Sequence, residues 1–579
     1  MTARTCLLFS LLFSLGSGLS SAQESAPVVP ETPNTVESVD GVDSPKETSG
    51  EETAATPEVA APAPENATTE TANAAAEGTA PVDSAAAEPA KEEKKKGMLE
   101  KFMPILILLI VVGIVLGRLP RVEGVEHSPE YRRRRVMNWL PLGFTYAFLY
   151  MARYNIKVSQ HAFEDMHTAS GASLMTNADF ATIFFWGTLT YGCSFIINGP
   201  LTDRYGGKFS ILMGAAGSAV MNLVMGLVTW QIVSGGAYAE YCMENLTVIF
   251  SALYAVNMYF QSFGAVAIVK CNAPWFHLRE RGVFGAIFGI LISLGIYFAF
   301  DVGYMIIENF ELQYVFLVPT VLLAIFFVVD VFMVRNTPGE AGFADFDTAD
   351  ATRDDGDQLG AAAVFKMMLK NPVILTIACI EFCSGFLRQA IMQWFRSFAK
   401  QTDDVLHLKD SFVYDNWGML LCCAGIMGGV FAGVISDRVF QSRRGPVAGV
   451  LYGGMLLGGI VMAFTFKTAM LPWLVVFMSM CIIGVHGMLS GTASMDFGGK
   501  KNVGVAVGII DGFVYAGTAV MAFVYGIILP DSSTDAAGDP SNWIWWPVSM
   551  IPIAALGLFL SLKVWNAKPK TKKSAAAAE

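Results

Sequence analysis

The chain has 579 residues, of which 53% are hydrophobic and 15% charged, and its formal net charge at pH 7 is −11. So large an apolar share excludes an ordinary soluble domain and is typical of a protein that crosses a membrane many times. Most of the acidic excess lies in residues 23–93, outside the apolar part. The net charge of the whole chain therefore does not describe the membrane part.

Motifs for nucleotide and zinc chemistry are absent from the sequence, including GxGxxG, GxxxxGK[ST] and HExxH. The nine cysteines are scattered, and their spacing matches neither a metal site nor a disulfide framework. We therefore expect no enzyme activity, no cofactor, no metal site and no nucleic-acid partner.

The N-terminal 97 residues are predicted to lie outside the membrane fold. Residues 1–22 resemble a secretory signal, with Arg4, the apolar run CLLFSLLFSL and small residues ending at Ala22. An uncleaved anchor helix is the alternative interpretation. Residues 23–97 are rich in Ala, Glu, Pro, Thr and Ser, which predicts a disordered tail. If the signal works, this tail is extracytoplasmic.

An extra membrane helix is predicted within residues 98–118. Its apolar core, FMPILILLIVVGIVLG (102–117), is short, but Lys101 and Arg118 flank it and can lengthen the span by snorkelling. The arginines at 118, 121 and 132–135 would then remain in the cytoplasm.

Twelve further apolar segments follow. They predict an all-α membrane protein with helices at about 137–160, 178–200, 208–231, 246–270, 282–306, 312–335, 372–395, 412–436, 446–466, 471–496, 503–529 and 542–564. A polar, acidic stretch at 336–371 divides them into an N-terminal half (130–335) and a C-terminal half (372–565). We expect this stretch to be a cytoplasmic linker.

The connections alternate in charge. One set carries Lys and Arg, for example DRYGGK (203–208), DRVFQSRRG (437–445), GGKKN (498–502) and the basic tail at 566–579. The other set mostly lacks them, although the loop at 396–411 is an exception. We expect the protein in the plasma (inner) membrane. The positive-inside rule then places both ends of the twelve-helix unit in the cytoplasm.

Two arginines inside apolar segments precede two copies of a repeated loop by nearly the same number of residues. GPLTDRYGGK (199–208) ends the second segment and GVISDRVFQSRRG (433–445) ends the eighth. Arg153 precedes Asp203 by 50 residues, and Arg388 precedes Asp437 by 49. This internal repeat of six helices predicts two equivalent halves that rock against each other, with the arginines at their interface.

The repeated loop resembles the signature of major facilitator superfamily transporters. More narrowly, YAFLYMARYN, WFHLRERG, GVISDRVFQSRRG and MDFGGKKNVGVAVG are similar to the organophosphate:phosphate antiporter family, which includes the glycerol-3-phosphate and hexose-phosphate transporters. The resemblance covers residues 130–565. It implies the major facilitator fold, with two six-helix halves related by pseudo-two-fold symmetry, plus the extra N-terminal helix.

The family resemblance also implies a binding site. Its members bind the phosphoryl group with one arginine from helix 1 and one from helix 7, which match Arg153 and Arg388. A guanidinium keeps its charge and offers a rigid fork of donors suited to phosphate. Three residues depart from the glycerol-3-phosphate transporter of this family: Phe195 and Ile292 stand where it has a lysine and a histidine, and Gly385 stands where it has a tyrosine three residues before the helix 7 arginine. The cavity tyrosines of the family match Tyr146, Tyr150, Tyr191 and Tyr515.

Other ionisable residues inside the segments are candidates for coupling. Asp511 lies in VGIIDGFVYAGTAV and could couple protons, oppose an arginine or bind a substrate amine. Glu381, seven residues before Arg388, is either a proton site, a salt-bridge partner of that arginine or a vestibule residue. His486 is either a packing residue or a titrating group.

The Asp-Arg pairs at the repeated loops are expected to hold the two halves together in one state, through contacts at the helix ends. These pairs are Asp203 with Arg204 and Asp437 with Arg438. Lys270, Arg279 and Arg281 either join them or simply anchor the membrane boundary.

We therefore predict a monomeric secondary transporter in the lipid bilayer, working by alternating access. Its expected substrate is a small anion, an organophosphate or phosphate moved in exchange for another phosphate. A proton-coupled carrier of organic anions or other solutes is one alternative, and a transporter-like sensor of sugar phosphate is another.

Overall fold

The computed structural model describes residues 126–277, 280–345, 348, 361–440 and 443–566. Nine further positions between 105 and 117, within the predicted extra helix, are also described, and all nine are helical. The predicted signal peptide, the predicted N-terminal tail and residues 567–579 lie outside the described residues. So do the side chains of 433–434, 437–438 and 491–503, and a few in 281–288 and 361–364.

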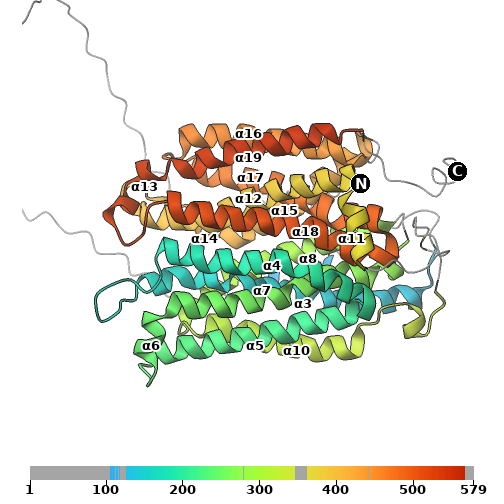
Figure 1. Cartoon of the computed structure of the whole chain (residues 1–579), viewed down its shortest axis with the longest axis horizontal. Helices are drawn as coiled ribbons and strands as arrows, with labels where there is room; N and C mark the ends of the chain where they lie inside the picture. The colour runs from blue at the N-terminus through green and yellow to red at the C-terminus, as the bar shows by residue number, and fades with distance from the viewer. Residues whose placement is uncertain are drawn as a thin grey trace, which may run out of the picture. The chain divides into compact units, whose positions relative to one another are not determined.

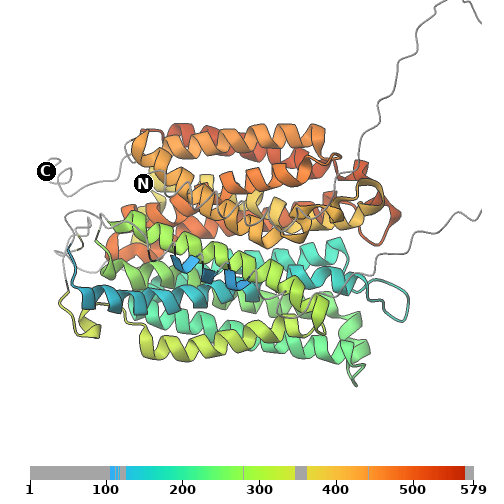
Figure 2. The ribbon, with the colours of Figure 1, turned by 180° about the vertical axis from the view of Figure 1, so that it is seen from behind.

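The first half contains six long helical segments, drawn from blue to yellow-green in Figures 1 and 2. They are α3 (Pro129–Glu164), α4 (Asn177–Tyr205), α5 (Gly207–Val233), α7 (Leu246–Asn272), α8 (Arg281–Tyr297) continued by a π-helix (Phe298–Val302) and α9 (Gly303–Asn309), and α10 (Tyr314–Met333). The short α6 (Ala239–Glu244) lies in a connection.

The second half contains six more long helices, drawn from yellow to red. They are α12 (Pro372–Gln401), α15 (Trp417–Arg438), α16 (Arg444–Thr465), α17 (Leu471–His486), α18 (Ser494–Ile528) and α19 (Trp545–Lys563). The short helices α13 (Asp403–Leu406) and α14 (Phe412–Asp415) connect α12 to α15. The predicted turn GGKKN (498–502) is helical and lies inside α18.

Ten of these segments are long and apolar enough to cross a membrane by length and composition. The other two predicted spans are α3, whose buried polar residues lower its hydropathy, and α15, whose apolar part Trp417–Ala432 is short. Each of the twelve predicted segments thus corresponds to a long helix, and no strand occurs in the described part of the chain.

Helix caps explain where α3 and α12 begin. The side chain of Ser128 accepts a hydrogen bond from the backbone N–H of Tyr131, and Asn371 does the same for Val373; a proline follows each cap. Both helices extend beyond the predicted ends, α3 to Glu164 and α12 to Gln401. The polar residues that suggested loops are therefore the last turns of helices.

The halves meet mainly along two helix pairs, α4 with α18 and α8 with α15, and α7 also contacts α18. Glycines let the backbones of α4 and α18 approach closely. A Cβ atom added at Gly199 would lie 2.8 Å from the carbonyl oxygen of Gly504, and one added at Gly504 would lie 2.7 Å from that of Gly199. Small residues are the usual means by which membrane helices pack tightly.

The predicted linker at 336–371 contains a helix, α11 (Ala361–Leu369). Its Met368 is buried in a cluster with Ile374 of α12 and Val505 and Ile509 of α18, and Phe365 and Leu369 pack against the same cluster. The apolar spacing of AAAVFKMML explains this docking. The end of the linker is thus part of the second half's core.

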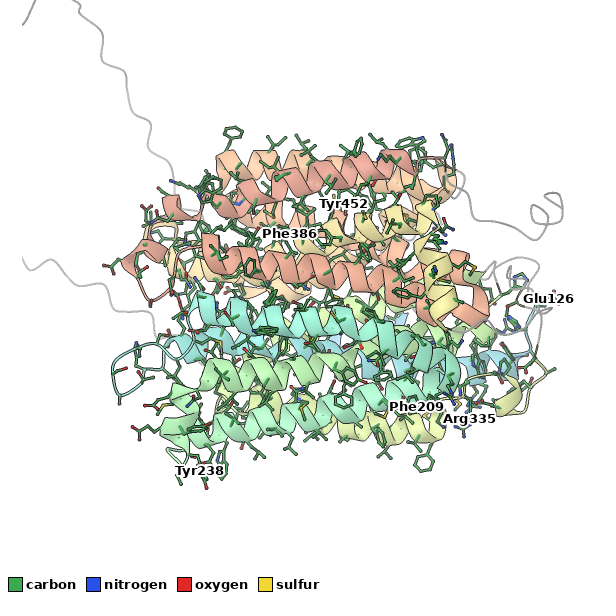
Figure 3. The ribbon with its side chains drawn as sticks, viewed as in Figure 1. Glu126, Phe209, Tyr238, Arg335, Phe386 and Tyr452 are labelled. Carbon is green, nitrogen blue, oxygen red and sulfur yellow. The ribbon has the colours of Figure 1, made fainter. Side chains whose placement is uncertain are left out.

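Charged side chains pair with one another at one end of the bundle. Glu126 and Arg335 lie at one end and Tyr238 at the other (Figure 3). At the first end Arg135 Nη1 binds Glu280 Oε1 at 3.0 Å, and His127 lies 3.1 Å from the same carboxylate. Partial burial works to raise the pKa of Glu280, but Arg135 and the other donors outweigh it and lower that pKa below its usual range.

Candidate functional site

Arg153 lies in the middle of α3 and is 1% exposed. Its guanidinium donates hydrogen bonds to Gln261 Oε1 (2.8 Å), to Tyr191 Oη (3.3 Å) and to the hydroxyl of Tyr515. These partners come from α7, α4 and α18, so the contact with Tyr515 crosses between the halves. All three partners are neutral.

Aromatic rings surround the same guanidinium. Its Cζ lies 4.8 Å from the ring centroids of Tyr150 and Tyr191 and 5.6 Å from that of Tyr515. The rings of Tyr191 and Tyr515 are stacked with centroids 3.7 Å apart, and Tyr146 meets Tyr150 edge to face at 5.3 Å. The structure therefore brings together Arg153 and all four tyrosines predicted from the family resemblance.

Arg388 lies in the middle of α12 and is 5% exposed. Its Nε is buried without a hydrogen-bond partner among the described residues. Its guanidinium interacts electrostatically with Tyr150 and Tyr515, both of which also face Arg153. The two predicted arginines thus share two tyrosine neighbours at the interface of the halves.

Glu381 is fully buried and pairs with His486, whose Nδ1 lies 2.8 Å from Glu381 Oε2. The other carboxylate oxygen, Oε1, is buried without a hydrogen-bond partner among the described residues. Asp511 accepts a hydrogen bond from the hydroxyl of Ser490, and it interacts electrostatically with His486, Glu381 and Arg388. The three ionisable residues singled out in the second half therefore form one cluster beside Arg388.

Asp203 joins the halves at the end of α4. It accepts backbone hydrogen bonds from Gly504 and Val505 of α18, both at 3.2 Å, and forms an ion pair with Lys270 at 2.6 Å. Its neighbour Arg204 is exposed, with its guanidinium 5.3 Å from the ring of Tyr205. Asp437 and Arg438 end α15, but their side chains lie outside the described residues, as does Arg279.

The three departures from the family have distinct surroundings. Phe195 is buried and meets Tyr191 edge to face at 5.1 Å. Ile292 is partly buried on α8. At Gly385 an added Cβ would lie only 1.9 Å from the carbonyl oxygen of Val514, so the backbone of α18 occupies the space that a side chain on α12 would need.

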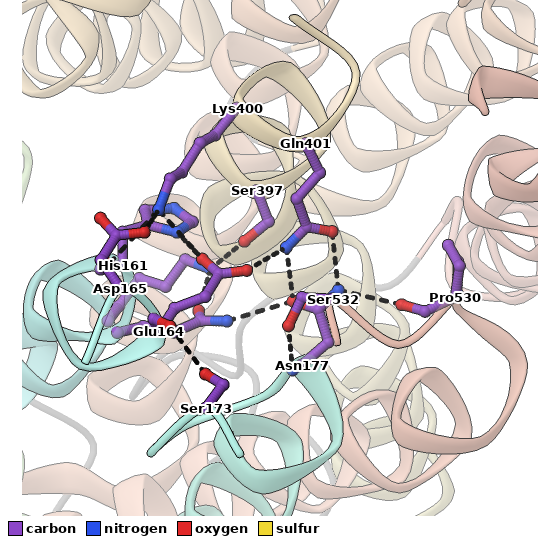
Figure 4. A network of polar contacts seen from close by, with 12 residues as sticks. His161, Glu164, Asp165, Ser173, Asn177, Ser397, Lys400, Gln401, Pro530 and Ser532 are labelled. Carbon is purple, nitrogen blue, oxygen red and sulfur yellow. Dashed lines mark hydrogen bonds and ion pairs between the residues drawn. The ribbon is translucent and has the colours of Figure 1, made fainter. Parts of the chain in front are cut away.

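A polar network lies at the end of the bundle at which α3 ends and α4 begins (Figure 4). Lys400 of α12 binds Glu164 (3.2 Å) and Asp165 (2.8 Å), and Gln401 donates to Glu164 Oε1 (3.0 Å). Asn177 of α4 donates to Gln401 Oε1 (2.9 Å) and to the carbonyl of residue 530 (3.0 Å). This network links both halves.

Two buried cations lie between the arginines and this network, and neither was predicted as a site residue from the sequence. Lys157 lies one helical turn after Arg153, and Arg396 lies eight residues after Arg388. The guanidinium of Arg396 is sandwiched between the rings of Tyr304 (3.7 Å) and Tyr414 (3.8 Å). Their helical spacing from the two arginines was the signal available in the sequence.

Three curated relatives are similar over most of the chain. The "Glycerol-3-phosphate transporter" of Bacillus subtilis (strain 168) is 24% identical and covers 77% of this chain and 96% of its own. A "Probable hexose phosphate transport protein" of Chlamydia pneumoniae is 22% identical (68% and 84% covered). The "Membrane sensor protein UhpC" of Salmonella typhimurium (strain LT2) is 22% identical (70% and 87% covered).

These relatives confirm the resemblance to the organophosphate:phosphate antiporter family. The sequence profile of the Major Facilitator Superfamily matches residues 142–522, which include α4 through α17 entirely and most of α3 and α18. That range contains Arg153, Arg388 and their tyrosine neighbours. By its sequence and its two six-helix halves, this multi-pass membrane protein belongs to the Major Facilitator Superfamily of transporters.

Proposed function

We propose that this chain carries a phosphorylated anion across the membrane in exchange for another phosphate, with Arg153 and Arg388 binding the phosphoryl group. Tyr146, Tyr150, Tyr191 and Tyr515 would line the site as neutral donors and ring faces. The substrates printed for two of the relatives, glycerol 3-phosphate and hexose phosphate, support this class.

One observation carries the proposal. Two guanidinium groups are buried at the interface of the halves, and no carboxylate forms an ion pair with either of them among the described residues. Glu381, the acidic residue seven positions before Arg388, is already bound by His486. Because burying an unpaired charge costs several kcal/mol, an anionic ligand is the natural partner for this pair.

Contacts at both ends support alternating access. The polar network of Figure 4 joins the halves at one end, and Asp203 joins α4 to α18 at the other. In the proposed cycle the bound anion draws the halves together around the arginines, and the contacts at one end then separate. Asp437, Arg204 and Arg438 would take part in the second set.

We further propose an orientation in the plasma membrane. The positive-inside rule assigns the end with Asp203 to the cytoplasm and the end with the polar network to the outside. We call these the inner and outer ends. Both termini of the twelve-helix unit are then cytoplasmic, and the segment before the extra helix is extracytoplasmic.

Counterflow in proteoliposomes tests the function. Purified full-length protein is reconstituted with internal unlabelled phosphate, and uptake of labelled phosphate is measured against external glycerol 3-phosphate, glucose 6-phosphate and carboxylates. We expect phosphorylated compounds to compete and carboxylates not to. Correctly folded protein that exchanges no phosphate would refute the proposal.

A proton-coupled carrier is the second candidate, because Glu381, His486 and Asp511 form a buried ionisable cluster beside Arg388. If this cluster couples protons to transport, Asp511→Asn should change the rate of uptake driven by a pH gradient about tenfold and flatten its pH profile. The exposed Asp535→Asn serves as the matched control. An unchanged rate and pH profile in Asp511→Asn would exclude the cluster from coupling.

A sensor is the third candidate, because one relative is a membrane sensor protein. A sensor would bind a sugar phosphate in sealed vesicles without moving it across the membrane. The same counterflow measurement, combined with equilibrium binding, separates the two functions.

A further inference from the structure

Lys157 is buried where the two halves meet. Its side chain belongs to α3, is 1% exposed as a residue, and donates hydrogen bonds to Gln160 Oε1 (2.6 Å) on its own helix and to Ser397 Oγ (2.7 Å) on α12. Its Nζ also lies 4.5 Å from the ring centroid of Phe180 and 5.4 Å from that of Trp394. All four contacts are with neutral groups.

A positive charge at Nζ would not be balanced locally. Among the described residues no carboxylate lies within ion-pair distance of Nζ. Glu164 is the acidic group that interacts with it electrostatically, but that carboxylate is bound by His161, Lys400 and Gln401. The other charged groups that act on Lys157 are cations, Arg396 and Lys400. Hydroxyl, amide and ring contacts recover only part of the cost of burying a charge.

The position of Lys157 places it on the route between the arginines and the outer end. It follows Arg153 by four residues, which puts the two cations on one face of α3, about 6 Å apart along the helix axis. Its cross-half partner Ser397 follows Arg388 by nine residues, also toward the polar network. Separation of the halves at the outer end would therefore remove Ser397 and free a donor of Lys157.

We propose that Lys157 is an outer anion site, which binds the phosphoryl group of a substrate arriving from outside before Arg153 and Arg388 take it. The proposal rests on the proposed function above. While the halves are in contact at the outer end, Ser397 and Gln160 accept hydrogen bonds from the ammonium. In the outward-open state the incoming phosphate replaces Ser397 as the acceptor. Substrate arriving from the cytoplasm meets the arginines with Lys157 still covered.

The competing interpretation is a purely structural contact in which Lys157 only holds α3 to α12. The two interpretations differ in their sidedness. A structural contact affects both faces of the transporter, whereas an outer anion site affects the affinity for external substrate alone.

The main test uses Lys157→Met, which keeps the length of the side chain and its packing against Phe180 and Trp394 but removes the charge. The KM for labelled inorganic phosphate is measured separately from the outer and inner faces in oriented proteoliposomes. We expect the external KM to rise about ten- to a hundredfold, as for loss of a hydrogen bond to a charged group, and the internal KM to stay within about twofold. Lys157→Arg should restore most of the external affinity.

Two controls make the result specific. Lys409→Met removes an exposed cation in the connection after α12 and should leave the external KM unchanged. Ser397→Ala removes the competing hydroxyl and should leave the external KM unchanged or lower, whereas a structural contact predicts the same defect as in Lys157→Met. The result for Ser397→Ala distinguishes the outer anion site from a structural contact even if Lys157→Met does not fold.

The outcomes separate this inference from the proposed function. If the wild type exchanges phosphate and Lys157→Met has an unchanged external KM, or equal rises on both faces, the outer site is wrong and the proposed function stands. If the folded wild type exchanges no phosphate, the proposed function is wrong and the outer site falls with it.

Discussion

Arg153→Lys is expected to reduce the rate of phosphate exchange about 100-fold, and Arg388→Lys is expected to do nearly as much. The guanidinium of Arg153 reaches three partners on three helices, Gln261, Tyr191 and Tyr515. A lysine keeps the charge but has neither the fork nor the Nε donor, so it leaves buried partners unpaired and loses two-point binding of phosphate. Initial rates of counterflow at equal amounts of reconstituted protein measure the effect.

The exposed Arg133→Lys is the matched control for both substitutions, because it makes the same chemical change outside the site. Its exchange rate should equal that of the wild type. Full exchange by Arg153→Ala would contradict the proposed role of this arginine, whatever the lysine variants do. Equilibrium binding of phosphate to Arg388→Lys would show whether the loss arises at the binding step.

Gly385→Ala is expected to destabilise the second half by about 3 kcal/mol or more. The new Cβ would lie 1.9 Å from the carbonyl oxygen of Val514, and that oxygen belongs to a helix backbone which has no rotamer to change. Thr518 also donates to the carbonyl of Gly385 at 3.2 Å, so α12 and α18 are held in this close approach. Thermal unfolding of the purified protein in detergent measures the loss.

Gly453→Ala is the control for this substitution. Gly453 lies inside α16, and an added Cβ there meets nothing within 4 Å. Alanine should therefore leave the stability unchanged or raise it by about 1 kcal/mol through its better helix propensity. Equal unfolding temperatures for Gly385→Ala and the wild type would show that the contact between α12 and α18 is looser than described.

Gly385 also shows how far sequence comparison reaches. The resemblance to the antiporter family indicated that a tyrosine is missing at this position, so the binding cavity was expected to have one hydrogen-bond donor fewer. The structure supplies the physical reason, since α18 passes where that side chain would lie. A single glycine in a sequence does not reveal which neighbouring backbone requires it, so this contact could not be predicted.

The arginines were predictable because a charge in an apolar segment is rare and costly. Their tyrosine neighbours could be named only through the family resemblance, and the structure places those side chains around Arg153. The pairing of Glu381 with His486 could not be predicted, because these residues are 105 positions apart on different helices. Their spacing carries no periodic signal.

Lys157 was missed for a different reason. The predicted span ended at residue 160, and a lysine three residues from the end of a span reads as an ordinary anchor at the membrane boundary. In the structure α3 continues to Glu164, which places Lys157 nearly two turns inside the helix. Errors of one turn at a helix end are common, and here such an error left a buried charge close to the predicted membrane boundary.

The docking of α11 bears on where this chain can be cut. Met368 and its neighbours Phe365 and Leu369 cover apolar side chains of α12 and α18. A C-terminal fragment beginning at 372 would expose that apolar surface, whereas one beginning before residue 361 would keep it covered. For co-expression of the two halves as separate polypeptides, the natural break therefore precedes α11, although the hydropathy of the sequence alone would put it at the start of α12.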